Sequence, residues 1–411
     1  LVILLLQGCT TNSDPIDNSP DEVDIRYLAG GETTIFNANS HAFSNPAPNL
    51  SEAKLDLHLE GDAAFEFEFV AAPAVLNSGL GPVFNGNSCI GCHFRDGRVV
   101  PAEAGEQMTS QLLRISIPGT SPHGGPNPVP GFGTQLQSKS LFGIPAEAEV
   151  RVQWTEETFQ FADGEAYSLR TPSYILSNPY QPLPSGLMIS SRVAPSVFGR
   201  GLLEAIPEET ILELADENDA DGDGISGRAN YVWDPATQST MLGRFGLKAN
   251  TATMLTQTAD AAHQDMGITN PIFLKESVEG QSQLDTLQDD PEVDMNYLET
   301  VTFYTQTLAV PARRAIDDPD VLRGEVLFKQ ANCASCHVPV LQTGLLEGVE
   351  SVSNQRIQPY TDLLLHDMGP GLADGRPDYL ASGSEWKTPA LWGIGLTELV
   401  GGHTFFLHDG R

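Results

Sequence analysis

The chain has 411 residues, 40% of them hydrophobic, and its 54 acidic against 22 basic residues give a formal net charge of −32. This length predicts a globular protein of two or three domains, and 39 Gly and 29 Pro indicate long, turn-rich connections. So acidic a chain lacks the clustered Lys and Arg that bind phosphate, which excludes nucleic acid as a partner and leaves a basic protein as an allowed one.

The chain begins with six apolar residues followed by Gln7-Gly8-Cys9. This run is too short to span a bilayer, matches the end of a secretory signal and resembles a bacterial lipobox, in which the cysteine carries lipid. We therefore expect export to the bacterial periplasm and a lipid anchor at Cys9 as the only membrane attachment, a plain signal peptide being the alternative. Residues 1–24 would then comprise a signal remnant and, from residue 10, a disordered tether, with the true N-terminus missing.

An N-terminal domain is predicted over 25–145, around the run Cys89-Ile90-Gly91-Cys92-His93. A C-x-x-C-H run is typical of covalent haem: Cys89 and Cys92 would bond its vinyl groups and His93 would ligate its iron. Ahead of the run, glycines would let the backbone pass close to a flat porphyrin and Phe84 could pack against it. Arg95 and Arg98 follow it and could pair with haem propionates or lie in solvent.

A middle region over 146–310 is predicted to hold a small β insertion, an acidic loop and linking helices. From about 146 to 176, apolar and polar residues alternate on both sides of Asp163-Gly164, which predicts antiparallel strands joined by a turn. Pro207 opens a short helix. Apolar residues at helical spacing predict a long helix over 292–308.

The acidic loop has the front half of an EF-hand calcium site. Asp219, Asp221 and Asp223 occupy its first, third and fifth places, glycine the sixth, and Ile225 the seventh, where a backbone carbonyl ligates. The twelfth place holds Asn230 instead of Glu, and the residues after it are expected to form a strand. A calcium ion at this loop is one interpretation, and a metal-free acidic turn is the other.

A C-terminal domain is predicted over 311–411, where a helix at 320–328 leads into a second run, Cys333-Ala334-Ser335-Cys336-His337. Chance predicts only about 0.0013 C-x-x-C-H runs in a chain with 5 Cys and 9 His, so two such runs favour two c-type haems. Cys333, Cys336 and His337 would hold the second haem. The alternative is one zinc ion held by four thiolates, but roughly 240 residues between the thiol pairs is far beyond usual zinc spacing.

The residues around the second run resemble those of cytochrome c domains, in which a glycine such as Gly324 permits a close helix crossing. Residues 360–369, 387–391 and 406–411 look like segments of bacterial di-haem cytochrome c peroxidases. More closely, the chain resembles the di-haem oxidoreductase family, sometimes labelled thiol oxidoreductase, in these segments: 79–98, 201–207, 219–230, 243–250, 265–269 and 301–314. Leu247 departs from the family, in which Trp is expected at that position.

This resemblance implies a mainly α fold class with long loops: two cytochrome c-like haem domains plus a small antiparallel β insertion. Family members continue past the final His-Asp-Gly-Arg into a helix with a further histidine, so we expect a missing C-terminus and a sixth iron ligand beyond residue 411. Thioether and imidazole side chains supply the other candidates for distal ligands. They are Met108, His123, Met266, Met368, His403 and His408.

Two haems permit a division of labour, in which one collects electrons and the other performs a peroxidase-like reaction. His408 with Asp409 is the candidate catalytic pair, because an imidazole oriented by a carboxylate can shuttle protons. Glu103 and Glu106 are weaker acid or base candidates. We expect a small redox protein as electron donor and peroxide as oxidant; a non-enzymatic di-haem electron carrier is the alternative, and no free cysteine pair supports thiol oxidation.

Overall fold

The computed structural model describes residues 23–411, so the predicted signal remnant, Cys9 and most of the predicted tether lie outside the described residues. Within this range, no helix combines the length and the apolar composition needed to cross a bilayer.

The secondary structure corrects the expected fold class. About 22% of the chain is helical and another 22% is in strands, which form several small sheets, so a mainly α fold with cytochrome c-like domains is wrong. Most of the strands have only two to four residues, too few for an alternating pattern to be recognised in a sequence. Some of their partners are also distant in the chain, as in the pairing of Thr34 with Val310.

The largest sheet has four strands: β3 (Gln111–Thr120) pairs with β4 (Pro126–Asn127), β5 (Gln135–Leu136) and β9 (Met188–Val193). One face of the sheet is buried in a hydrophobic cluster with Ile115, Phe132 and Val150 among its members. This sheet is the main β component that the sequence pattern did not predict.

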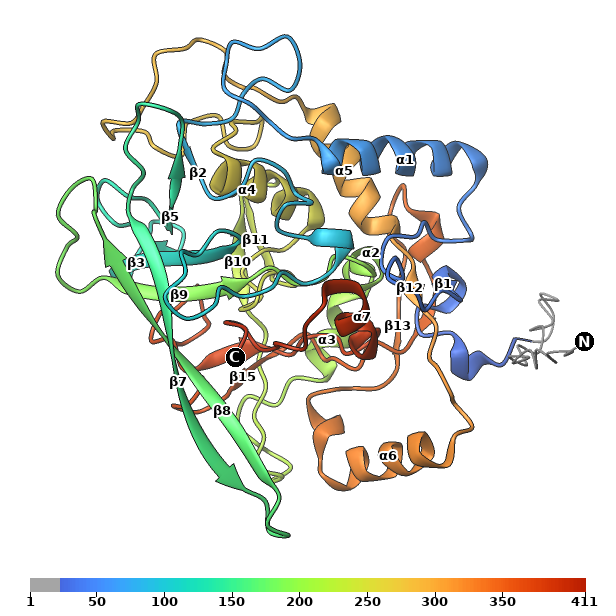
Figure 1. Ribbon diagram of the computed structural model, residues 1–411. Coiled ribbons are helices and arrows are strands. Elements are labelled where there is room, and N and C mark those ends of the chain that lie inside the picture. The colour runs from blue at the N-terminus through green and yellow to red at the C-terminus, as the bar shows by residue number, and fades with distance from the viewer. Residues whose placement is uncertain (1–22) are drawn as a thin grey trace, which may run out of the picture.

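The predicted antiparallel strands form one long hairpin. Strand β7 (Glu149–Gln160) pairs with β8 (Ala166–Ser177) along its whole length, around the expected turn. Val150 and Val152 anchor the base of the hairpin in the core, whereas Phe161 and Leu169 near its tip are exposed. The hairpin therefore projects from the body of the molecule (Figure 1).

Five further sheets have two strands each. They are β1 (Thr34–Ile35) with β12 (Val310–Pro311), β2 (Val83–Phe84) with β6 (Lys139–Ser140), β10 (Tyr231–Asp234) with β11 (Ser239–Leu242), β13 (Leu341–Gln342) with β14 (Arg356–Ile357), and β15 (Leu365–Asp367) with β16 (Glu385–Lys387). Two of them, β1–β12 and β2–β6, join distant parts of the chain. The strand expected after the acidic loop is confirmed as β10. Only the β1–β12 pair is parallel among these five.

Three helices pack together at the top of Figure 1: α1 (Glu52–Glu66), α4 (Met254–Met266) and α5 (Met295–Thr307), the last confirming the predicted long helix. A Cβ atom at Gly61 on α1 would lie only 2.5 Å from the Thr300 carbonyl oxygen of α5, so glycine is needed for this crossing. The largest hydrophobic cluster lies where these helices meet α2 (Arg200–Glu204), and Cys89 packs against it.

The remaining helices are short or lie at the edge of the molecule. They are α3 (Glu208–Glu213), α6 (Pro319–Gln330), α7 (Thr397–Gly401) and 3-10 turns at Ile25–Tyr27, Gly31–Thr33, Phe94–Asp96, Cys333–Ser335, Glu350–Val352 and Ile394–Leu396. Helix α6 confirms the helix expected before the second C-x-x-C-H run, and it buries no residue within the described chain. Gly324 on α6 faces open space there, so the expected close helix crossing at this glycine is wrong for residues 23–411.

Candidate cofactor sites

The first C-x-x-C-H run forms a tight turn that presents its histidine. The amides of Cys92 and His93 both donate to the Cys89 carbonyl, at 3.1 and 3.0 Å. The His93 ring donates from Nδ1 to the Pro195 carbonyl at 2.8 Å. This bond sets the ring orientation and tautomer and leaves Nε2 as the nitrogen available to a metal, the arrangement usual for metal-ligating histidines.

The thiols of the first run are partly buried and lie near an acidic side chain. Burial, followed by the nearby Asp265 carboxylate, raises the pKa of both Cys89 and Cys92 to about 12. Asp265 is itself buried, and this raises its pKa to about 6. A Cβ atom at Gly86 would lie 3.5 Å from the Cys92 sulfur, so the chain passes close over this thiol. The neutral thiols are thus kept in apolar surroundings suited to a flat apolar group.

The second run repeats the histidine arrangement. The His337 amide donates to the Cys333 carbonyl at 3.0 Å, and its ring donates from Nδ1 to the Tyr360 carbonyl at 2.8 Å. Nε2 is again the nitrogen left for a metal. The Phe328 ring of α6 lies 6.3 Å from the His337 ring, which places the helix beside the run.

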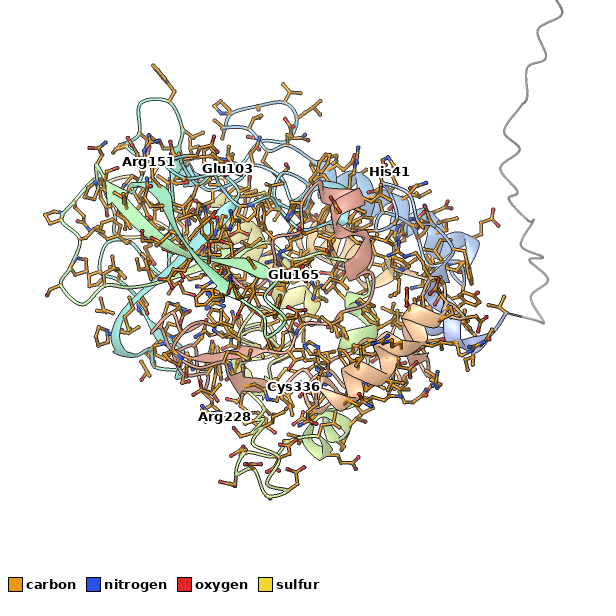
Figure 2. All side chains as sticks on the ribbon, turned by 60° about the horizontal axis from the view of Figure 1, so that its bottom comes forward. His41, Glu103, Arg151, Glu165, Arg228 and Cys336 are labelled. Carbon is orange, nitrogen blue, oxygen red and sulfur yellow. The ribbon has the colours of Figure 1, made fainter. Side chains whose placement is uncertain are left out.

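Another histidine, His366, contacts the second run. His366 Nδ1 lies 2.8 Å from the Ser226 carbonyl oxygen and 3.5 Å from the Cys336 sulfur, and Nε2 lies 2.8 Å from Asp362 Oδ2. Both nitrogens therefore face acceptors, which favours the protonated ring. Burial alone would lower the pKa of His366, but the bonds with Asp362 and Cys336 outweigh it and raise the pKa to about 10. Figure 2 shows Cys336 beside the segment that carries Arg228.

A family model described as "Di-haem oxidoreductase, putative peroxidase" matches residues 23–411. The chain belongs to this di-haem oxidoreductase family. No curated protein and no solved structure matches the chain. Membership implies haem cofactors, and the residues of both runs fit such a group, because each offers two thiols and an imidazole oriented for iron.

The two runs of this di-haem oxidoreductase do not combine into one metal site. Among residues 23–411, the clusters of three or more potential metal ligands are both carboxylate clusters, and the thiols of the two runs do not form one. The geometry therefore argues against the four-thiolate zinc alternative.

The expected propionate partners are engaged elsewhere. Arg98 donates to the carbonyls of Phe405 and Leu407, and Arg95 lies over the Phe94 ring, 4.9 Å from its centroid. Two other cations, Arg200 and Lys387, were missed by the sequence analysis because nothing in their spacing ties them to either run.

Arg200 and Lys387 are cations held in low-dielectric surroundings. Burial lowers the pKa of Arg200 to about 10, and burial together with the charge of Arg200 lowers the pKa of Lys387 to about 7. The charge of Arg200 also acts on His93. Neither cation forms an ion pair in the described part of the chain, although the charge of Asp362 partly opposes the lowered pKa of Lys387. Arg200, whose charge acts on His93, is therefore free to neutralise an acidic group of a ligand next to the first run.

The candidate distal ligands lie in separate environments. Met108 is buried in the core of the large sheet, whereas Met368 is 48% exposed. The ring of His123 stacks on Trp233 with 4.0 Å between centroids, and His403 Nε2 lies 3.1 Å from the Arg98 carbonyl oxygen. Among these candidates, Met266 is the one that shares a hydrophobic cluster with a haem-run cysteine, because Cys89 packs against the same cluster.

His408 and Asp409 lie together in the interior. His408 Nε2 is 3.4 Å from Asp409 Oδ2, and Arg411 Nε donates to the same carboxylate at 2.9 Å. The His408 ring stacks on Trp386 with 3.7 Å between centroids. Burial lowers the pKa of His408 to about 4 despite Asp409, so the imidazole is neutral at pH 7.

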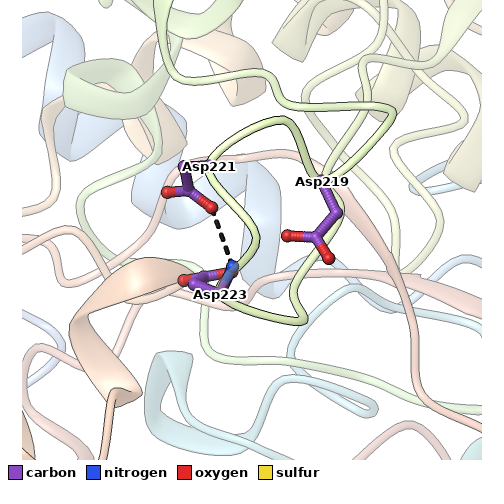
Figure 3. A group of neighbouring side chains, drawn as sticks. All are labelled: Asp219, Asp221 and Asp223. Atoms are coloured by element: carbon purple, nitrogen blue, oxygen red, sulfur yellow. Dashed lines mark hydrogen bonds between the residues drawn. The ribbon is translucent and has the colours of Figure 1, made fainter.

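The weaker acid candidates and the acidic loop are at the surface. Glu103 and Glu106 line a shallow hollow of about 240 Å³ together with Val100 and Gln111. In the acidic loop, carboxylate oxygens of Asp219, Asp221 and Asp223 all lie within 4.8 Å of one another (Figure 3). The loop contacts the second run, since Asp223 Oδ2 accepts hydrogen bonds from Asn332 at 3.1 Å and Ser335 at 3.0 Å.

Proposed function

We propose that this di-haem oxidoreductase is an exported c-type enzyme with a peroxidase-like reaction at one haem and electrons supplied through the other. In this proposal Cys89 and Cys92 hold the first haem and Cys333 and Cys336 the second. When bound, such haems supply one-electron redox chemistry and a site for cleaving an O–O bond. The matching Nδ1 bonds of His93 and His337 support these two residues as proximal ligands.

A continuous set of contacts between the runs is the observation that carries this function. From His93 it passes to Pro195 on the segment after β9, where the Val193 amide donates to the His408 carbonyl at 2.8 Å. His408 stacks on Trp386, and Trp386 is the cross-strand neighbour of His366, which touches Cys336. A path of this kind supports electron transfer from one run to the other.

His408 and Asp409 would hold and move a proton. The imidazole is neutral at pH 7, so it can accept a proton that Asp409 then stabilises across the 3.4 Å between Nε2 and Oδ2. Arg411 donates to the carboxylate and orients it. The pair lies on the path just described, where proton and electron movement can be linked.

The other residues proposed for the haems are a distal ligand and two counter-charges. Met266 is the best-placed candidate for the first haem, because it shares the cluster against which Cys89 packs. His123, Met368 and His403 are poorer candidates, being stacked, exposed or bonded to backbone. Arg200 and Lys387 would pair with propionates, as buried cations that form no ion pair in the described chain.

A calcium ion at the acidic loop is also proposed, with Asp219, Asp221, Asp223 and the Ile225 carbonyl as ligands. The clustering of the three carboxylates supports it. The bonds from Asn332 and Ser335 to Asp223 would tie the ion to the second run. We further propose a periplasmic, lipid-anchored protein that takes electrons from a small redox protein and reduces peroxide.

The test is peroxide turnover by the full-length haem-loaded protein with a reduced electron donor, together with the spin state of the oxidised haems. If the protein is the proposed enzyme, we expect peroxide turnover and one haem with an exchangeable coordination position. Two six-coordinate haems without turnover would identify the protein as an electron carrier. Trp386→Leu should slow electron exchange between the haems, and Trp233→Leu, which removes an indole off the path, should not.

A further inference from the structure

A second group of carboxylates follows α4 in the sequence, whereas the acidic loop precedes α4. The group lies within the long irregular segment between α4 and α5. Oxygens of Glu276, Asp290 and Glu292 all lie within 4.8 Å of one another. The three residues come from the two ends of the stretch 276–292, which contains no helix or strand. In Figure 1 this gold segment runs along the upper edge of the molecule.

The spacing of these oxygens suits one shared cation. Calcium binds oxygen ligands at about 2.3–2.6 Å, so two ligands on opposite sides of one ion lie about 5 Å apart and all other pairs lie closer. Separations of up to 4.8 Å therefore meet the limit for a common ion. Carboxylates are the hard donors that calcium prefers, and three of them satisfy much of its charge.

Nothing in the described structure balances the negative charge of this group. The stretch 276–294 has no Lys, Arg or His, and Lys275 just before it pairs with Glu279 instead. Thr269 supplies neutral donors to the group: its amide donates to Glu292 Oε2 at 2.6 Å, and its hydroxyl lies 2.9 Å from Asp290 Oδ1 and also contacts Glu292. These donors carry no formal charge, so they cannot neutralise three carboxylates.

The Glu276 carboxylate is the feature that points to a ligand. Its side chain is buried, and its Oε2 atom has no hydrogen-bond partner. A buried carboxylate oxygen without a donor, on a residue grouped with two other carboxylates, is strongly unfavourable unless a cation joins the group.

We propose that Glu276, Asp290 and Glu292 bind a divalent cation of the calcium type, at a site separate from the acidic loop. The bound ion joins the two ends of the stretch 276–292. Glu292 also packs against the segment before the first C-x-x-C-H run, since a Cβ atom at Gly79 would lie 2.7 Å from Glu292 Cβ. The site thereby braces that segment.

The experiment is calcium titration calorimetry on the full-length, haem-loaded protein after removal of metal with a chelator. The double substitution Asp219→Asn with Asp221→Asn first removes any binding at the acidic loop. This background protein is expected to bind one further calcium ion. Adding Glu276→Gln should weaken that binding at least about tenfold, because one charged ligand is lost. Glu279→Gln removes a charge from the same segment at an exposed position and should leave binding unchanged.

A background protein that binds no calcium, or a Glu276→Gln protein that binds as tightly as the background, would overturn the proposal. Limited proteolysis gives a readout that does not depend on the folding of the Glu276→Gln protein. Calcium is expected to slow cleavage near the exposed Leu284 and Leu287 in the background protein. Equal cleavage with calcium and with chelator would contradict closure of the segment.

Discussion

Replacing Asp96 by asparagine tests how the structure holds the first C-x-x-C-H run. Asp96 is 2% exposed, its amide donates to the His93 carbonyl at 2.7 Å, and its Oδ1 accepts from the Tyr304 hydroxyl at 2.9 Å. Burial raises its pKa from 3.8 to about 7. Its backbone φ is 57°, a left-handed value that asparagine tolerates at least as well as aspartate. The substitution therefore removes a charge and keeps the geometry.

The sign and size of the effect follow from this pKa. Between pH 3.8 and 7 the unfolded Asp96 is ionised while the folded one keeps its proton, so its contribution to stability falls as pH rises through this window. A shift of about 3 pKa units at 1.36 kcal/mol each gives an upper limit of about 4 kcal/mol. The neutral amide of the variant has no such loss, so Asp96→Asn should match the wild type near pH 4 and exceed its stability increasingly up to pH 8.

The assay is urea unfolding of the haem-loaded protein at pH 4, 6 and 8. The quantity compared is the difference in unfolding free energy between variant and wild type, which cancels the other titrating groups. Asp163→Asn, at the exposed turn of the β7–β8 hairpin, controls for the loss of one negative charge. A difference that stays constant with pH, or a variant less stable at pH 8, would refute the reasoning.

Two further substitutions test buried charges. Lys248→Met should lower the free energy of unfolding in urea by about 3–5 kcal/mol, because Nζ is fully buried and its loss leaves Asp374 without its 2.9 Å partner. The control Lys275→Met, at an exposed ion pair, should change the free energy of unfolding by less than about 1 kcal/mol. Equal effects of the two substitutions would contradict this expectation. Burial lowers the pKa of His366, but its hydrogen bonds with Asp362 and Cys336 outweigh burial and keep the pKa near 10. The folded protein therefore holds this proton more tightly than the unfolded chain, so the free energy of unfolding of the wild type should fall as pH rises from 6.5 to 10. Asp362→Asn should remove most of this fall, and an unchanged pH profile would show that Asp362 does not hold the proton.

Local signals in the sequence predicted several elements well. Asp163-Gly164 between alternating residues located the hairpin, and the helical spacing before Pro311 located α5. Such patterns can be recognised because each element carries its own complete signal over twelve or more residues. The two C-x-x-C-H runs are equally local, since their chemistry requires adjacent residues.

The rest depends on contacts between distant residues. The fold class was wrong because pairs such as β15 with β16 have three residues each and no readable period. Arg200 and Asp265 approach the first run from other parts of the chain, more than 100 residues away, and no spacing rule links them to it. Arg200 starts α2 and Asp265 is on α4, so the packing of these helices in the folded chain brings such groups to the run.

We propose that both runs carry covalent haem, and intact-mass spectrometry of the purified mature protein tests this attachment. We predict a polypeptide heavier by two haem groups, reduced to one by Cys89→Ala with Cys92→Ala and likewise by Cys333→Ala with Cys336→Ala. A mass equal to that of the polypeptide with only its lipid would contradict the account.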